Sequence, residues 1–194
     1  SNEPQYQGRC AHALAGYKAW LKEHYGTVEA LNQAQGKAFM SFDDVTLPEN
    51  VRDYAAWSDY CRYNHDCFLG FHEFLRDLIH EYAPELPVHA KIMSHAFEDP
   101  GKYEVGIDAE RFSQLGTISG NDCVQNFDTP DGPERMQNWL TMAMNYTLQR
   151  SAAPGNPVFN SEDHIIPDGY ARFVPGAHIR TVYWTQALYG QGAA

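Results

Sequence analysis

Residues 133–164 read PERMQNWLTMAMNYTLQRSAAPGNPVFNSEDH, and they predict one helix followed by one short strand. Pro133 suits the first turn of a helix over residues 133–150. Its apolar side chains available for burial are Met136, Trp139, Leu140, Ala143 and Leu148. The run Pro157-Val158-Phe159 predicts a buried strand whose end lies close to Glu162. A helix that leads into such a strand is the repeating unit of a parallel α/β sheet.

The same helical spacing occurs nearer the amino terminus. Apolar residues predict helices over residues 13–25 and 28–32, and Gly26 ends the first of them. A longer helical stretch covers residues 51–82 and stops before Pro84. Its second half places six apolar side chains on one stripe: Phe68, Phe71, Phe74, Leu75, Leu78 and Ile79.

Short apolar runs predict the remaining strands. Residues 87–93 and 116–120 are expected strands, and residues 179–188 are expected to form the last one. That last segment carries Val182, Trp184 and Leu188. Asn2 and Glu3 are expected at the carboxyl end of a further strand that precedes the first helix. Strands and helices thus alternate along the whole chain.

These elements predict an α/β fold of the (β/α)8 TIM-barrel type that covers the end of strand 4 through strand 8. A closed barrel needs about 200–250 residues. We therefore expect residues 1–194 to be a single catalytic-domain segment, a partial TIM barrel within a longer enzyme. A partial barrel exposes sheet edges and apolar surface, which favours a homo-oligomer or association with the missing barrel half.

Composition argues against several kinds of partner. The chain carries 25 acidic and 14 basic residues, a formal net charge of −11, so no nucleic acid partner is expected. No run approaches the ~20 apolar residues that span a bilayer, and no membrane association is expected. The 4 cysteines are scattered, and the 9 histidines do not fall into a metal-ligand spacing. The sequence therefore predicts no disulfide framework, no metal and no cofactor.

Six polar or aromatic residues are assigned to the carboxyl ends of the expected strands: Glu3, His95, Asn121, Asp122, Glu162 and Trp184. In a (β/α)8 barrel the carboxyl ends of the strands carry the reactive groups, so these side chains are expected to share one site. Glu3 and Glu162 suit carbohydrate chemistry. Hydrolysis of a glycosidic bond with retention uses one carboxyl group as acid/base and another, roughly 5 Å away, as nucleophile.

Residues 17–36 read YKAWLKEHYGTVEALNQAQG. This run resembles the segment after the fourth strand in glycoside hydrolase family 42, the β-galactosidases, and in their relatives of the same retaining clan. The similarity continues through the long helix, through residues 87–93 as the fifth strand and through residues 157–164 as the seventh. It covers nearly the whole chain.

The resemblance implies roles for individual residues. Glu3 corresponds to the acid/base at the end of strand four, and Asn2 to the residue that hydrogen-bonds the sugar 2-hydroxyl. Glu162 corresponds to the nucleophile at the end of strand seven. Trp184, on the expected eighth strand, would provide an apolar platform under the sugar ring.

The chain also departs from the family pattern. Residues 120–123 lack the tyrosine that many clan members place near the nucleophile, so that role would pass to Asn121, Asp122 or another loop residue. A preference for galactose is therefore not fixed by the sequence. Three histidines are each expected either to hydrogen-bond a hydroxyl group or to hold a structural position: His95, His164 and His178.

Three functions are consistent with this sequence, and a carbohydrate is the expected ligand. The first is a retaining glycoside hydrolase that cleaves a β-glycoside by double displacement. The second is a non-catalytic carbohydrate-binding protein on the same scaffold. The third is a half-barrel fragment that becomes active only with its missing half.

Overall fold

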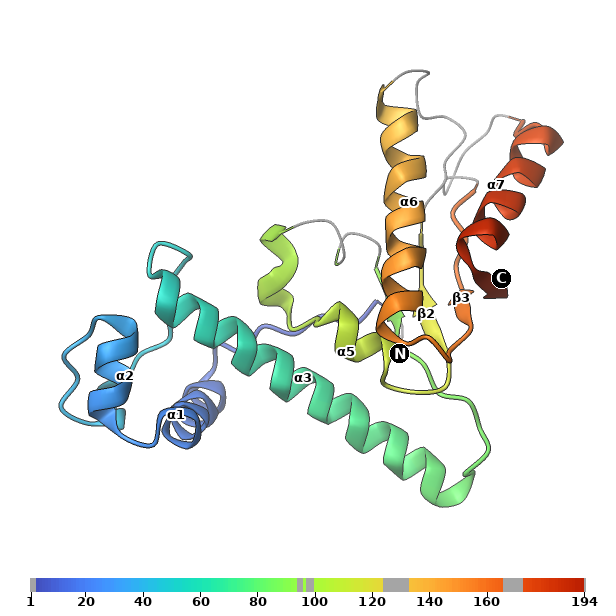
Figure 1. Cartoon of the computed structure of the whole chain (residues 1–194). Helices are drawn as coiled ribbons and strands as arrows, with labels where there is room; N and C mark the ends of the chain where they lie inside the picture. The colour runs from blue at the N-terminus through green and yellow to red at the C-terminus, as the bar shows by residue number, and fades with distance from the viewer. Residues whose placement is uncertain (1–2, 94–95, 97–99, 124–132, 166–172, 194) are drawn as a thin grey trace. The chain divides into compact units, whose positions relative to one another are not determined.

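The computed structural model describes residues 3–93, 96, 100–123, 133–165 and 173–193 (Figure 1). The chain divides into two compact units. The helical unit consists of Gln5–Gly70 and Tyr103–Ile107. The sheet unit consists of Ser1–Pro4, Phe71–Lys102 and Asp108–Ala194. Over the described ranges, every helix is too short or too polar to cross a membrane.

The helical unit contains α1 (Ala11–Tyr25), α2 (Val28–Gln35), the 3-10 helix η1 (Phe42–Asp44) and the first part of α3 (Tyr54–Tyr82). The helices expected from the sequence here are confirmed, and α2 extends to Gln35. The core consists of Tyr17, Leu21, Leu31, Val45, Tyr60 and Tyr63. Tyr17 and Leu21 lie one turn apart on α1, which places both on its buried face.

The sheet unit contains four parallel strands in the order β1-β2-β3-β4. They are β1 (Lys91–Ile92), β2 (Ser119–Asn121), β3 (Val158–Asn160) and β4 (Gln191–Ala193). Its helices are α5 (Ala109–Ser113), α6 (Pro133–Ala152) and α7 (Gly176–Tyr189), while η2 (Pro100–Val105) contributes residues to both units. The parallel α/β prediction is confirmed. Because the strands are parallel, their carboxyl ends lie along one edge of the sheet (Figure 1).

The strand boundaries differ from the sequence prediction. β1 occupies only Lys91–Ile92 of the expected 87–93 run, and β2 begins at Ser119, near the end of the expected 116–120 run. β3 agrees closely with the expected strand and ends at Asn160, two residues before Glu162. These shifts leave the expected order of strands unchanged.

The strand predicted over residues 179–188 is wrong, because these residues lie within α7 (Gly176–Tyr189). Val182 and Gln186 are both 0% exposed and lie four residues apart, which is the spacing of one helix face. Gly190 ends α7 with a φ of 104°, a left-handed conformation that favours glycine. The final strand, β4, follows directly after this turn.

The predicted helix over residues 133–150 is confirmed as α6, but only part of its expected apolar face is buried: Trp139 packs against the core cluster that contains Met142 and Tyr146. Leu140 and Leu148 are exposed. The buried side chains of the described part of α6 are Met142, Asn145, Tyr146 and Gln149. Gln149 accepts a hydrogen bond from Asn121 and donates one to the Gly120 carbonyl, so a polar face of α6 can be buried against β2. The expected burial of Met136 falls outside the described side chains.

The apolar stripe predicted on the second half of α3 is also largely exposed. Its exposed members are Phe71, Phe74, Leu78 and Ile79. In this part of the helix, His72 is buried and its ring packs against Phe112, with ring centroids 5.1 Å apart. Both residues belong to the sheet unit. An aromatic polar residue therefore takes the buried position that the sequence pattern assigned to phenylalanines.

Gly116 precedes β2 at a position where a side chain does not fit. A Cβ atom there would collide with the carbonyl oxygen of Val88, a backbone atom that cannot rotate away. Gly116→Ala is therefore expected to lower the free energy of unfolding by about 1–3 kcal/mol, measured by urea or thermal unfolding. Gly155→Ala is the matched control, because a Cβ there meets nothing within 4 Å. Equal losses in the two variants would contradict this steric account.

Candidate active site

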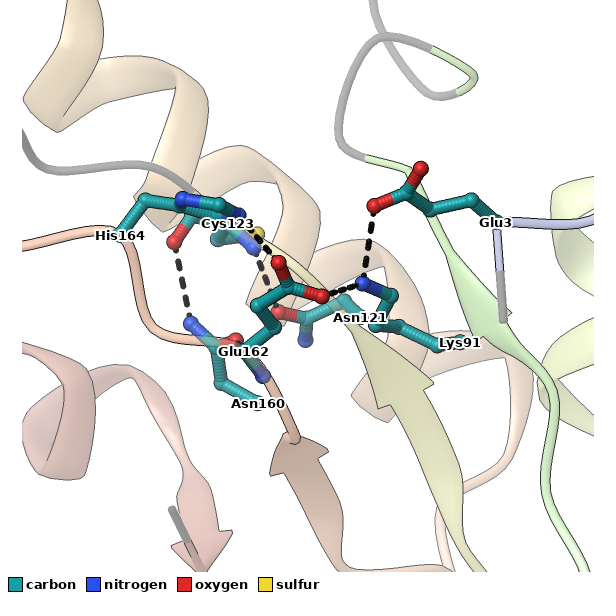
Figure 2. Close-up of polar contacts among 7 residues, drawn as sticks. All are labelled: Glu3, Lys91, Asn121, Cys123, Asn160, Glu162 and His164. Carbon is teal, nitrogen blue, oxygen red and sulfur yellow. Dashed lines mark hydrogen bonds and ion pairs between the residues drawn. The ribbon is translucent and has the colours of Figure 1, made fainter. Parts of the chain in front are cut away.

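Two carboxylates and one ammonium group meet at the carboxyl edge of the sheet (Figure 2). Lys91, on β1, donates a hydrogen bond to Glu3 Oε1 at 3.0 Å and another to Glu162 Oε2. Since both carboxylates bind the same nitrogen, their contacting oxygens are at most about 6 Å apart. The structure thus brings together Glu3 and Glu162, which the sequence predicted to share a site.

The three side chains differ sharply in exposure. The Lys91 side chain is 3% exposed, whereas Glu3 and Glu162 are 41% and 45% exposed. A ligand can therefore reach both carboxylates, while the lysine stem is enclosed by protein. Because a buried ammonium group is costly unless it is paired, the two carboxylates also stabilise Lys91 in this position.

Lys91 also biases the protonation of Glu162. Its hydrogen bond to Glu162 holds the pKa of that carboxyl group below the usual value. Burial by itself lowers the pKa of Lys91, but the hydrogen bonds to Glu162 and Glu3 outweigh burial and raise it. Lys91 and Glu162 therefore form a charged pair at neutral pH.

Glu3 has a strained backbone. Its φ of 44° lies in the left-handed region, and among described residues other than glycine it is the only one with a positive φ. The following residue, Pro4, restricts the backbone of Glu3 further. Strain of this kind persists where surrounding interactions enforce it, and it is common at functional sites.

Asn160, the last residue of β3, fixes the turn that carries Glu162. Its side-chain oxygen accepts a hydrogen bond from the Glu162 backbone N–H at 3.3 Å. Its amide nitrogen donates to the Cys123 carbonyl at 3.0 Å and to the Tyr146 hydroxyl at 3.2 Å. Asn160 is 1% exposed, so these bonds are enclosed within the sheet unit.

His164 lies beside Glu162, as the sequence suggested for a site residue. Its Nε2 atom is 3.3 Å from Glu162 Oε1, on the carboxylate oxygen that Lys91 does not contact. The two oxygens of Glu162 therefore have different partners. Whether His164 also binds a sugar hydroxyl stays a prediction.

Asn121 is the last residue of β2 and Asp122 follows it, at the strand end as expected, but both are buried. Asn121 donates to Gln149 at 2.7 Å and accepts from the Cys123 backbone N–H at 3.0 Å, so both ends of its amide are bonded within the protein. This pattern indicates a role in shaping the site. The predicted site residues Asn2 and His95 lie outside the described residues.

The predicted place of Trp184 at the end of a strand is wrong. Trp184 lies within α7 and is 72% exposed, so it does not follow a strand and cannot serve as the strand-end platform expected from the sequence. His178 also lies on α7, where its ring packs edge-on against Trp139 with centroids 6.3 Å apart. The correction for Trp184 follows from the helical character of this segment, whereas the packing of His178 agrees with the structural position that was one of its two expected roles.

Lys91 was not predicted from the sequence, although a signal for it exists. Lysine is rarely fully buried unless it is paired, and Lys91 stands between Ala90 and Ile92 in an apolar run. A lysine inside a predicted buried strand indicates a paired ammonium group. Its partners are far away in sequence and become evident only in the folded sheet.

Asp163 is held by α7. Gln186 Nε2 donates to both carboxylate oxygens of Asp163, at 3.0 and 2.9 Å. Burial raises the pKa of Asp163, and the hydrogen bonding from Gln186 partly offsets that rise. The ionised carboxylate therefore depends on this amide, which anchors the segment that also carries Glu162 and His164.

Gln186→Met removes that donor while keeping a long side chain. We expect the free energy of unfolding at pH 7 to fall by about 1–3 kcal/mol, because a buried carboxylate loses its hydrogen bonds. Burial raises the folded-state pKa of Asp163, so the carboxyl group becomes protonated in the folded protein at a pH above the ordinary aspartate value. The loss in the free energy of unfolding caused by Gln186→Met should therefore shrink as pH falls through that pKa, because the neutral group no longer needs the lost donor. Urea unfolding at several pH values measures this. Asp163→Asn in the same background should recover part of the loss, and a pH-independent loss with no recovery would contradict the account.

Comparison with known proteins agrees with this architecture. A crystal structure of an apo exo-carrageenase of glycoside hydrolase family 42 from Bacteroides ovatus superposes with a TM-score of 0.83, at 24% identity, over 99% of this chain and 29% of that one. A β-galactosidase from the haloarchaeon Halorubrum lacusprofundi gives a TM-score of 0.77 at 19% identity, over 96% of this chain and 30% of that one. The fold is therefore that of a (β/α)8 barrel, of which the described sheet is a part.

The family model for β-galactosidases of glycoside hydrolase family 42 matches residues 1–165. The chain belongs to this family. β-Galactosidase BgaP from a Planococcus species is 25% identical over 171 residues, which cover 81% of this chain and 23% of that protein. The chain thus spans less than a third of the length of these relatives.

Proposed function

We propose that the full-length protein is a retaining glycoside hydrolase that acts on a β-galactoside or a closely related β-glycoside. The observation that supports this most strongly is the shared contact of Glu3 and Glu162 with Lys91. It keeps the contacting oxygens within about 6 Å of each other, which is compatible with the roughly 5 Å between the carboxyl groups of retaining enzymes. Membership of the β-galactosidase family supports the substrate class.

In the proposed reaction, a Glu162 oxygen attacks the anomeric carbon while the glycosidic bond breaks and Glu3 donates its proton to the leaving oxygen. Water then attacks the same carbon, Glu3 takes the water proton, and the bond to Glu162 breaks. The lowered pKa of Glu162 suits the first step, because a nucleophile must be ionised. The exposure of both carboxylates suits access by a sugar.

The predicted site residues other than Glu3 and Glu162 are proposed to have two kinds of role. His164, together with Asn2 and His95, is proposed to hydrogen-bond sugar hydroxyl groups. Asn121 and Asp122 are proposed to support the site from inside the protein, because both are buried. The position of Asn121 beside Gln149 and Cys123 supports this division.

The function is tested with the full-length protein and a panel of glycosides. The panel contains aryl β-galactosides, aryl β-glucosides and carrageenan oligosaccharides, since one structural neighbour is described as an exo-carrageenase. Proton NMR of the fresh product should show the β-anomer first. A product that appears first as the α-anomer would contradict retention. Sugar binding without hydrolysis across the panel would favour a non-catalytic binding protein.

A further inference from the structure

Lys91 is a buried lysine whose ammonium group pairs with both glutamates of the site. Its side chain is 3% exposed, and its neighbours in the chain, Ala90 and Ile92, are 2% and 1% exposed. The ammonium group nevertheless reaches the exposed carboxylates of Glu3 and Glu162 at the sheet edge (Figure 2). An apolar side chain would suit this stretch of strand better if Lys91 only filled space, because burying an ammonium group costs free energy.

We propose that Lys91 is a shared counter-ion, a positioning residue that pairs with the single carboxylate charge of the reaction as that charge passes between Glu162 and Glu3. This inference rests on the proposed retaining mechanism. It adds a residue whose contact with both glutamates serves both chemical steps.

The charges balance at each stage of the proposed reaction. Before the first step, Glu162 is ionised and Glu3 carries a proton, so the two carboxyl groups hold one negative charge. When the Glu162 oxygen bonds to the anomeric carbon, Glu162 becomes a neutral ester and Glu3 becomes ionised by giving its proton to the leaving oxygen. The pair again holds one negative charge. Lys91 matches it with one positive charge throughout, and the second step restores the starting state.

The geometry allows this without a movement of the lysine. An ammonium group is a compact charge with three donors, so it can bind two carboxylates at the same time. Lys91 already binds Glu3 at 3.0 Å and Glu162 in the ligand-free protein. A charge that is already in place does not have to reorganise during the reaction. Such preorganised charges are the basis of electrostatic catalysis. The lowered pKa of Glu162 supports the same pairing.

The test uses Lys91→Met in the full-length protein, with Lys91→Arg as the variant that keeps the charge. Lys37→Met is the matched control, because Lys37 also pairs with a carboxylate, Asp53 at 2.6 Å, but in the helical unit. Three quantities are measured: kcat/KM against pH, the rate of labelling by a 2-fluoro-β-galactoside, and the rate at which the labelled protein recovers. Labelling reports the first step and recovery reports the second.

For Lys91→Met we expect kcat/KM to fall about 100-fold at the optimum pH. The acid limb of the profile should move up by about one pH unit, because loss of the cation favours protonated Glu162. Labelling and recovery should both slow at least about tenfold, because the lysine serves both steps. Lys91→Arg should keep the acid limb in place, and Lys37→Met should match the wild type.

Several results would overturn the proposal. A merely structural role would lower the rates without moving the acid limb. A lysine that serves Glu162 alone would slow labelling and leave recovery unchanged. If circular dichroism shows that Lys91→Met is unfolded, the same criteria apply to Lys91→Gln, which keeps donors but no charge. Wild-type protein that neither hydrolyses the substrate nor labels at Glu162 would refute the proposed function itself. If the wild type is active and labels at Glu162, but the acid limb of Lys91→Met lies where the wild-type limb lies, only the role of Lys91 is refuted.

Discussion

In the full-length protein, Glu162→Ala is expected to lower kcat by about a million-fold, the scale of loss when a catalytic nucleophile is removed. Alanine cannot form the covalent glycosyl intermediate, so the double displacement loses its first step. Stability should change little, because the side chain is 45% exposed. Initial rates on an aryl β-galactoside measure the loss.

Glu85→Ala is the matched control for Glu162→Ala. Glu85 is an exposed glutamate of the sheet unit that lies before β1, so its loss should leave kcat unchanged. Added azide should restore turnover of Glu162→Ala and give a glycosyl azide of inverted configuration, because the small anion enters the space left by the carboxylate. Retention of more than about one per cent of wild-type kcat would contradict a nucleophilic role for Glu162.

Glu3→Gln is expected to have the second largest effect, and its size should depend on the leaving group. For an alkyl β-galactoside, whose leaving oxygen needs a proton, kcat/KM should fall about 10²- to 10⁴-fold, the usual contribution of general acid catalysis. For a dinitrophenyl β-galactoside the fall should be far smaller, since that group leaves without protonation. Equal losses on both substrates would contradict the acid/base role, and Glu85→Gln serves as the control.

The parallel sheet could be predicted from the sequence because short apolar runs alternate with helical spacing. β3 shows this clearly: Val158 is fully buried, and the strand ends where polar residues begin. The same reasoning failed for α7, where Val182, Trp184 and Leu188 occur at alternate positions that resemble one face of a strand. The buried partner of Val182 is Gln186, a polar residue that an apolar pattern does not detect.

The candidate site was predictable in part. Glu3 and Glu162 could be proposed because each follows a strand, and parallel strands bring their carboxyl ends to one edge. Asn160 and Lys91 could not be assigned in this way, because their roles depend on partners elsewhere in the chain. Lys91 lies 88 positions from Glu3 and 71 from Glu162. Only the folded sheet brings these three charges together.

The central claim is that Glu162 is the nucleophile of a pair formed with Glu3. The most direct measurement is peptide mass spectrometry of the full-length protein after inactivation by a 2-fluoro-β-galactoside with a good leaving group. The account predicts one fluorosugar per chain, attached to Glu162 and absent from Glu162→Ala. A fluorosugar on any other residue, or unmodified protein from a preparation that hydrolyses β-galactosides, would contradict it.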